Sequence, residues 1–317
     1  GFETVSRIGN ATYPGHYDAG WHSTGTIGGF GTATAVGRLL GLSHAEMIWS
    51  IGLAATQAAG LRDMFGSMAK AFHAGRAAQN GYMAALLAQR GFTAGTQSIE
   101  GPRGFAAVQS PAYDLAKITA RLGQEFDLRA NSYKPFPCGL VVHPTIDACI
   151  QIRNEHNLDP RQVAAVRLRV APIVNDLCGK KNITSELESK FSIYHAAAVG
   201  LTKGKAGPRE FTDEAIKDPI VHRMRERIVV SADPSVPDES VYVEVELTDD
   251  RTLNKHLEHP IGSLKKPLSD RQLEDKFRNQ AVSLPKLQAD ELVKACWHID
   301  DLDNIEKLIL LAVPNAR

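Results

Sequence analysis

The first 95 residues are rich in alanine and glycine, and their apolar positions recur with helical spacing. One such run, residues 32–41, ends at Gly41, a residue type common directly after a helix. Ser43 and Glu46 have the spacing of a capping box that begins a second helix, and a third helix is expected over residues 69–90. Small side chains let helix backbones approach closely. The sequence therefore predicts an α-helical layer here.

The periodicity changes near residue 130. Residues 163–170 and 241–247 alternate apolar and polar side chains, which is typical of half-buried strands, and residues 252–257 are the expected hairpin partner of the second strand. Helical patterns lie between and after them, at residues 144–155, 189–201, 212–227 and 290–311.

These patterns predict a mainly α protein that combines an all-helical domain with a smaller α+β lid domain. The expected domains are residues 1–129 (helical), residues 130–288 (α+β), and a C-terminal helical segment, residues 289–317, that returns to the helical domain.

Composition excludes several partners. Among 317 residues, 36 Lys and Arg balance 36 Asp and Glu, so the basic surface expected of a nucleic-acid-binding protein is missing. No apolar run is long enough for a membrane span. Four cysteines stand far apart without metal-finger spacing, which favours free thiols in a cytoplasmic protein and no metal site. A small-molecule partner is expected.

Three clusters hold ionisable residues among small neighbours. In the first, His22 lies between Trp21 and Ser23-Thr24, just before a helix start. Backbone N–H groups and the helix dipole at such a place favour a bound anion such as a carboxylate. The alternative is that His22 caps the helix or bonds to a backbone carbonyl.

The second cluster lies on the expected helix 69–90. Lys70 and His73 are three residues apart and share a face, and Arg76 extends the row. Three potential cations among alanines are costly unless an anion compensates them, and a carboxylate substrate would do so. The alternative is a solvated basic stripe.

The third cluster is the segment from Lys134 to His143. Two prolines favour an extended chain that places Lys134 relative to Cys138, at the expected junction of the two domains, a common position for a small-molecule cleft. The alternative is a rigid linker with Cys138 packed as a small apolar residue. Tyr194 is a further candidate.

Histidine and lysine beside bound carboxylates suit proton transfer at a carbon next to a carboxylate. The lysines would stabilise the enolate-like charge while a neutral imidazole takes or returns the proton. This chemistry needs no redox cofactor.

The chain also resembles the MmgE/PrpD family, which includes 2-methylcitrate dehydratase, cis-aconitate decarboxylase and iminodisuccinate epimerase. The likeness is collinear over essentially the whole chain. The motifs that carry it are Gly20-Trp21-His22-Ser23-Thr24, Met68-Ala69-Lys70-x-x-His73-x-Gly75, Lys134-Pro135-Phe136-Pro137-Cys138 with His143-Pro144, Lys190-Phe191-Ser192-Ile193, and Gly262-Ser263-Leu264 through Lys276-Phe277.

This resemblance implies a homodimer with a cofactor-free site between a helical domain and an α+β lid. It implies His22 as the acid–base group and Lys70 and Lys134 as catalytic lysines that bind carboxylate. The expected substrate contacts are His73 in support of Lys70, Ser23, Thr24, Cys138, His143 and Tyr194.

Two features depart from the family pattern. Gly139 stands where the decarboxylases carry a catalytic His and the epimerase a Cys, which argues against decarboxylation by that route. The N-terminal helices of the family are also missing, so the chain is expected to be cut from something longer.

Three functions remain open. The first is a lyase of the 2-methylcitrate dehydratase type acting on a small di- or tricarboxylic acid. The second is an isomerase or epimerase of a dicarboxylate such as iminodisuccinate. The third is a non-catalytic or split subunit that needs a separate N-terminal chain.

Overall fold

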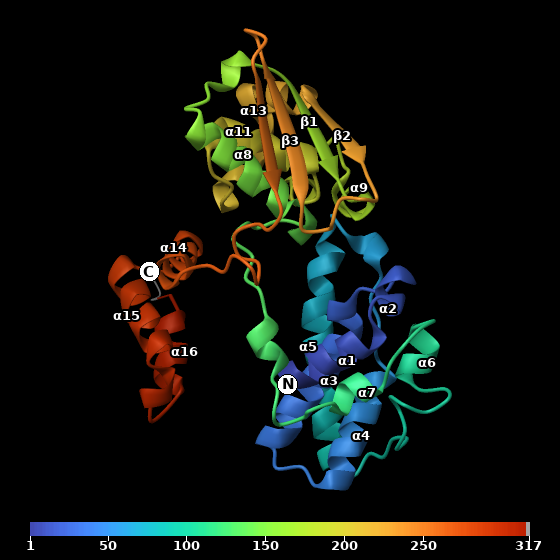
Figure 1. Cartoon of the computed structure of the whole chain (residues 1–317). Coiled ribbons are helices and arrows are strands. Elements are labelled where there is room, and N and C mark those ends of the chain that lie inside the picture. Colours follow the sequence, from blue (N-terminus) through green and yellow to red (C-terminus); the bar gives the residue numbers. More distant parts are fainter. Residues whose placement is uncertain (315–317) are drawn as a thin grey trace. The chain divides into compact units, whose positions relative to one another are not determined.

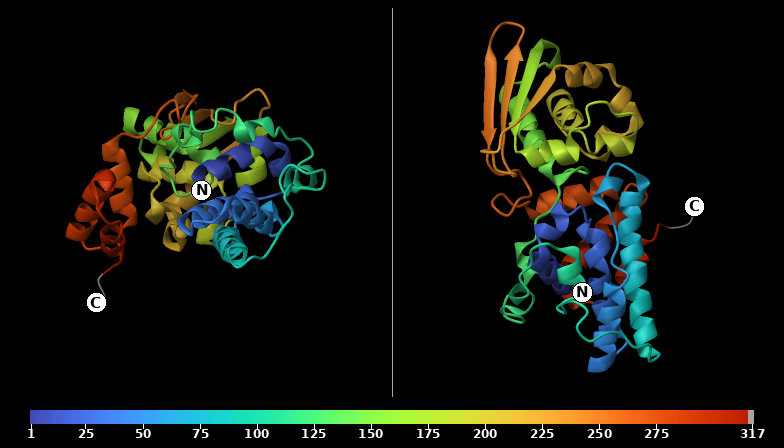
Figure 2. Two further views of the ribbon diagram at one scale, coloured as in Figure 1. Left: turned by 90° about the horizontal axis from the view of Figure 1, so that it is seen from below. Right: turned by 90° about the vertical axis from the view of Figure 1, so that its right-hand side faces the viewer.

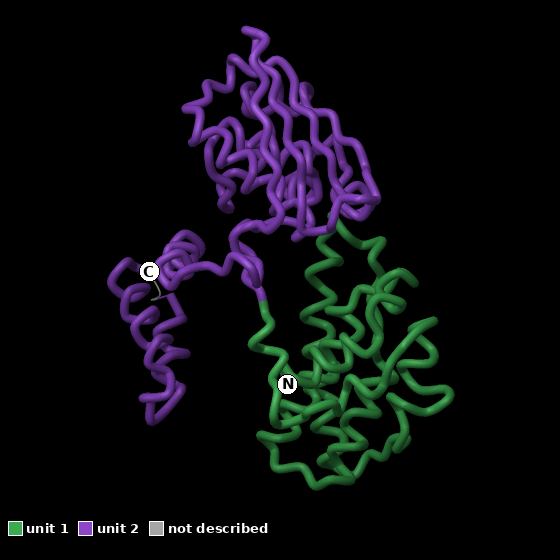
Figure 3. Tube along the Cα trace, in the orientation of Figure 1, with its two compact units in different colours: residues 1–131 green, residues 132–317 purple. Residues whose placement is uncertain are grey.

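The computed structural model describes residues 1–314, and the chain divides into two compact units (Figure 3). Unit 1 spans residues 1–131 and unit 2 spans residues 132–317. Residues 315–317, at the end of the expected segment 289–317, lie outside the described residues. The expected boundaries at 129/130 and 288/289, and the return of the last segment to the helical domain, stay predictions.

Unit 1 consists of helices and loops (Figure 1). The helices are α1 (Phe2–Thr12), α2 (Gly15–Asp18), α3 (Ser23–Leu39), α4 (His44–Ala55), α5 (Met68–Gln89), α6 (Phe105–Gln109) and α7 (Ala116–Thr119). The expected capping box is confirmed, because Ser43 Oγ accepts from the Glu46 N–H and the Glu46 carboxylate accepts from the Ser43 N–H. Gly41 and Gly91, with φ of +68° and +81°, follow α3 and α5 as expected.

Unit 2 carries a four-stranded sheet in the order β2-β1-β3-β4. Its strands are β1 (Val163–Val170), β2 (Ile228–Ala232), β3 (Val241–Leu247) and β4 (Thr252–Leu257). The expected strands β1 and β3 and the hairpin partner β4 are confirmed, with β3 antiparallel to both of its neighbours. Strand β2, parallel to β1, was not expected from the sequence.

Six helices of unit 2 lie on one face of this sheet (Figure 2, right). They are α8 (His143–Glu155), α9 (Pro172–Cys178), α10 (Glu186–Ser189), α11 (Ile193–Lys203), α12 (Asp213–Lys217) and α13 (Pro219–Glu226). Of these, α8, α9 and α11 contact the strands. Val166, Leu168 and Val170 of β1 are buried, whereas Arg167 is exposed and pairs with Glu244 at 2.6 Å and with Glu246 at 2.8 Å. The amphipathic alternation thus sets which face receives the helices.

Two expected helices are each interrupted. The helix predicted over 212–227 is α12 and α13, because Pro219 cannot continue α12 and Asp218 instead caps the new helix by accepting from Ile220 N–H. Helix 290–311 is α15 (Lys286–Trp297) and α16 (Glu306–Ala312), preceded by α14 (Asp270–Gln280). The chain is nonetheless mainly α with an all-helical part and an α+β part, as predicted.

Among residues 1–314, none of the helices has the length and apolar character that crossing a bilayer requires.

The contact between α3 and α5 organises unit 1. Phe30 and Ala33 of α3 and Ala84 of α5 are fully buried in its core. At Gly81 the two backbones approach so closely that a Cβ atom would meet the Gly29 carbonyl oxygen, besides Ala33 N at 2.8 Å. A glycine is therefore required at position 81 by backbone atoms, which cannot move aside without shifting a helix.

We expect Gly81→Ala to lower the free energy of unfolding by about 1–3 kcal/mol, because the added methyl group forces α3 and α5 apart. Gly75→Ala, on the same helix, is the matched control. A Cβ atom at Gly75 meets nothing within 4 Å, so the substitution gains helix propensity and stabilises by about 0.5–1 kcal/mol. Urea unfolding followed by circular dichroism measures both, and equal effects of the two substitutions would contradict the packing described.

Candidate active site

The backbone of His22 is held at the beginning of α3. Its N–H donates to the Gly60 carbonyl at 3.0 Å, and its own carbonyl accepts from the N–H of Gly25 at 2.8 Å. The imidazole does not cap the helix, although His22 occupies the N-cap position. The side chain is only 7% exposed. The ring is thus turned into unit 1 with both of its nitrogens available for chemistry or side-chain contacts.

The imidazole of His22 contacts a side chain of helix α5. His73 Nδ1 lies 2.8 Å from His22 Nδ1, and the His73 side chain is buried as well. The edge of the Phe65 ring packs on His22, with ring centroids 4.9 Å apart and planes at 86°. His73 was expected to support Lys70, and its contact in the structure is with His22.

Two glycines make room for the histidine pair. A Cβ atom at Gly25 would meet the Ala59 carbonyl oxygen at 2.6 Å and His73 Cβ at 3.2 Å. Gly60 has a φ of +143°, which L-residues rarely adopt, and lies against the His73 ring. The loop around Gly60 can therefore close over His73 only because both positions lack a side chain.

The electrostatics of the pocket keep His22 neutral. Burial, followed by the positive charge of Lys70 and the electrostatic interaction with His73, lowers the pKa of His22 from 6.5 to about 4. Lys70 is half-buried, and no carboxylate among residues 1–314 pairs with it. A neutral imidazole beside an uncompensated ammonium group suits a proton acceptor that lies next to a site for an anion.

The other expected members of these two clusters lie nearby on α3 and α5. Ser23 is half-buried and Thr24 is exposed in the first turn of α3. Arg76 is exposed and donates to Gln79 Oε1 at 2.8 Å. Arg76 is therefore a solvated residue of α5, as the alternative of a solvated basic stripe predicted. That alternative does not hold for His73, because His73 is buried.

Unit 2 holds the third cluster. Lys134 is exposed, and its Nζ donates to the Cys138 carbonyl at 3.4 Å. Burial raises the pKa of the Cys138 thiol and raises that of Cys178 to about 12, so both are thiols rather than thiolates at neutral pH.

His143 is the first residue of α8 and is only 1% exposed, and this burial lowers the pKa of its imidazole to about 3. Its Nε2 is buried without a hydrogen-bond partner among the described residues.

Gly139 and Tyr194 complete the residues expected in unit 2. The Gly139 N–H donates to the Lys190 carbonyl at 2.9 Å, and a Cβ atom at Gly139 would lie 2.5 Å from Cys178 Sγ. Tyr194 is half-buried at the beginning of α11, and Lys181 Nζ lies 5.7 Å from its ring centroid. A side chain at position 139 would thus need Cys178 to give way.

The structure therefore groups the predicted residues within each unit. His22, Lys70 and His73 come together in unit 1, and Lys134, Cys138 and His143 come together in unit 2. The convergence of His22 and Lys70 with Lys134 stays a prediction.

Two buried histidines were not expected from the sequence. His16 Nδ1 donates to the Gln109 carbonyl at 3.0 Å, and its Nε2 accepts from Thr26 Oγ1 at 2.7 Å, which ties α2 and α3 to α6. His195 Nε2 donates to the Glu210 carbonyl at 2.8 Å. Neither histidine belongs to a run of spaced polar residues, so no pattern signalled them.

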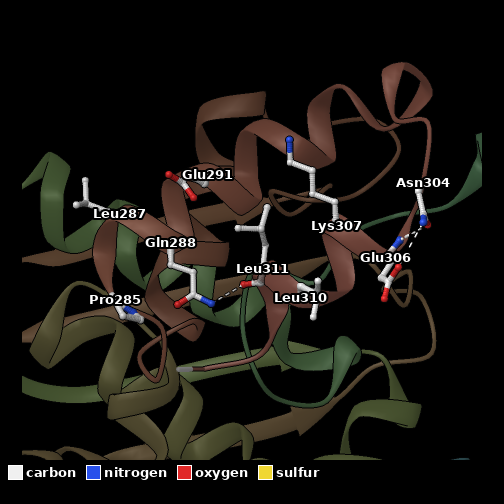
Figure 4. A pocket seen from close by; sticks show the side chains of 9 residues that line it. All are labelled: Pro285, Leu287, Gln288, Glu291, Asn304, Glu306, Lys307, Leu310 and Leu311. Atoms are coloured by element: carbon white, nitrogen blue, oxygen red, sulfur yellow. Dashed lines mark hydrogen bonds between the residues drawn. The ribbon is translucent and has the colours of Figure 1, made fainter. Parts of the chain in front are cut away.

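Two open hollows lie elsewhere. One, of about 650 Å³, lies between α15 and α16 and is lined by Leu287, Gln288, Lys307 and Leu310 among others (Figure 4). The other, of about 860 Å³, lies beside the loop of residues 93–104 in unit 1. Neither contains a residue of the three clusters, and neither is lined by side chains whose pKa is strongly shifted, so we place the candidate site at His22.

Among residues 1–314, no group of three or more His, Cys, Asp or Glu side chains is arranged to hold a metal.

Comparisons with known proteins identify the family. Residues 1–117 match the family model of the MmgE/PrpD N-terminal domain, and residues 136–299 match that of the MmgE/PrpD C-terminal domain. The chain belongs to the MmgE/PrpD family. This confirms the family predicted from the sequence.

Curated relatives of this MmgE/PrpD chain are cis-aconitate decarboxylases. That of Aspergillus terreus is 26% identical over 98% of this chain and 68% of its own length. Those of mouse and human are 25% and 26% identical over 92% of this chain. The match spans 62% of the length of the mouse and human proteins.

We expect the buried neutral His143 to make stability depend on pH. Its pKa is about 3 in the folded protein and near 6.5 when unfolded, so the unfolded chain binds the extra proton between these values. Stability is therefore complete above about pH 6.5 and falls as the pH is lowered, by up to about 1.4 kcal/mol per pH unit. His143→Phe should reduce the slope of unfolding free energy against pH between about pH 7 and 5.5.

Ile152→Val, a buried apolar change on the same helix, is the control, because it lowers stability by about 0.5–1.5 kcal/mol at every pH. Urea titrations at several pH values measure the slopes. An unchanged slope in His143→Phe would show that folding does not lower the pKa of His143.

Proposed function

We propose that this protein is a lyase that acts on a small di- or tricarboxylic acid by moving a proton at a carbon next to a carboxylate. The observation that carries the proposal is the neutral, buried His22 beside Lys70, a half-buried cation without an ion-pair partner among residues 1–314. The curated relatives support a tricarboxylic acid as the substrate class, since each is named a cis-aconitate decarboxylase.

In the proposed reaction, Lys70 binds a substrate carboxylate and stabilises the enolate-like charge that develops when the proton leaves. The neutral imidazole of His22 takes that proton. Lys134 is proposed as a second carboxylate-binding cation, and Ser23 and Thr24 as further substrate contacts. Cys138, His143 and Tyr194 remain proposed substrate contacts.

Dehydration of the 2-methylcitrate type is the reaction that we propose first. The C–H electron pair becomes the new C=C bond, the C–O bond to the neighbouring carbon breaks, and the proton held by His22 goes to the departing hydroxyl to form water. Gly139 supports this choice over decarboxylation, because the resemblance places a catalytic His of the decarboxylases at this position. A Cβ atom at Gly139 would lie 2.5 Å from Cys178 Sγ.

Decarboxylation of cis-aconitate is the second candidate, and the names of the relatives favour it. The two reactions differ in what is released. Incubation with 2-methylcitrate should produce an unsaturated acid, followed by absorbance, without carbon dioxide. Release of carbon dioxide from cis-aconitate would favour the second candidate, and absence of turnover with either acid would contradict the proposed function.

We expect His22→Asn to lower kcat by about 10²-fold or more, because the proton acceptor is lost. Lys70→Gln should raise KM by about tenfold and also lower kcat, because a charge-assisted contact with the substrate carboxylate is removed together with the cation that stabilises the enolate-like charge. Arg76→Gln, two turns along the same helix, is the matched control and should leave both constants unchanged, because Arg76 is exposed and bonded to Gln79. Equal effects of Lys70→Gln and Arg76→Gln on KM would contradict the role of Lys70.

A further inference from the structure

The contact between His22 and His73 joins two nitrogens of the same kind. Their Nδ1 atoms lie 2.8 Å apart, a normal hydrogen-bond distance. A neutral imidazole carries one N–H and one lone pair, so this contact is a hydrogen bond only when one of the two Nδ1 atoms is protonated and the other is not. Two protons between the rings would clash, and none would leave two lone pairs facing each other.

The surroundings keep this bond away from water. The two side chains are 7% and 9% exposed, and the Phe65 ring covers His22 edge-on. The backbone of Gly25 and Gly60 lies against His73. A hydrogen bond in such a buried place is stronger than one in water.

The charges around the pair favour a neutral starting state. Burial is the first cause that opposes a positive charge on His22, and the ammonium group of Lys70, on the same helix as His73, opposes it further, as would a second proton on the His73 ring. Arg62, on the neighbouring loop, is turned to the Tyr17 ring at 4.1 Å and to the Tyr17 carbonyl at 2.9 Å. These surroundings therefore favour an uncharged His22.

We propose that His22 and His73 share one proton between their rings and work as one acid–base unit, in which His73 is the positioning and proton-storing partner of His22. The part played in turnover rests on the proposed function, whereas the shared proton does not. His22 remains the residue that meets the substrate.

The proton transfers between the substrate, His22 and His73 balance without a water molecule. In the resting state His22 Nδ1–H donates to His73 Nδ1, and His22 Nε2 carries a lone pair. When His22 Nε2 takes the substrate proton, the electron pair of the C–H bond stays on the substrate, and the Nδ1 proton crosses to His73. His22 is then again neutral, as its Nε2–H form, and the positive charge resides on His73. Reversal of the two transfers returns a proton through His22 Nε2.

The shared proton is tested first by nuclear magnetic resonance on the full chain labelled with ¹⁵N-histidine. A hydrogen bond between the rings should give a scalar coupling between the two Nδ1 nuclei, and the coupling should be lost in both His22→Asn and His73→Asn. Circular dichroism confirms that each variant is folded. Absence of the coupling in the unsubstituted protein would overturn the proposal.

Kinetics then separate proton storage from mere positioning. Asn at position 73 offers an amide near the place of Nδ1 but cannot hold a proton, whereas Phe fills the volume without a polar group. We expect both His73→Asn and His73→Phe to lower kcat by about tenfold or more with KM changed by less than about threefold. Lys70→Gln should differ from both by raising KM by about tenfold in addition to lowering kcat.

The exposed His44, in the first turn of α4, gives the matched control, and His44→Asn should keep the kcat of the unsubstituted protein. If His73→Asn also keeps that kcat, proton storage is overturned. If no carboxylic acid is turned over at all, the proposed function fails, and the nitrogen coupling still decides whether the two histidines share a proton.

Discussion

The close approach of glycine backbones is the constraint on which unit 1 depends. Gly81 lets α5 pack against the backbone of α3, and Gly25 and Gly60 let the first turn of α3 and the loop after α4 close around His73. Because helices and loop are in contact through backbone atoms, there is little freedom for His22 and His73 to move apart. The same small residues that predict tight helix packing therefore also bring two distant histidines within hydrogen-bond distance.

This packing has an electrostatic consequence. A histidine removed from water and placed near a lysine is more stable without its proton, and the pKa of His22 falls to about 4. In solution an imidazole is partly protonated near neutral pH, but in this pocket it is a base next to a cation. The proposed lyase chemistry requires that combination, since the cation attracts the carboxylate and stabilises the charge left by the departing proton.

Much of this architecture could be predicted from local pattern. The capping box at Ser43 and the alternation in β1 and β3 were sufficient to place those elements, because each depends on neighbours in sequence. Periodicity on α5 correctly placed Lys70 and His73 on one helix. It could not show that His73 contacts His22, since the two residues are 51 positions apart and meet only when α3 packs against α5. The burial of His16 and His195 could not be predicted either, because a single buried polar residue produces no periodic pattern in the sequence.

The central claim, that His22 is neutral at neutral pH, is tested most directly by its own titration. Imidazole ¹H–¹⁵N spectra of the full chain, with His22 assigned by loss of its signals in His22→Asn, would follow the ring from about pH 8 downward. The account predicts that His22 stays neutral through pH 6 and takes a proton with a pKa near 4. A midpoint near 6.5, the value of an exposed histidine, would contradict it.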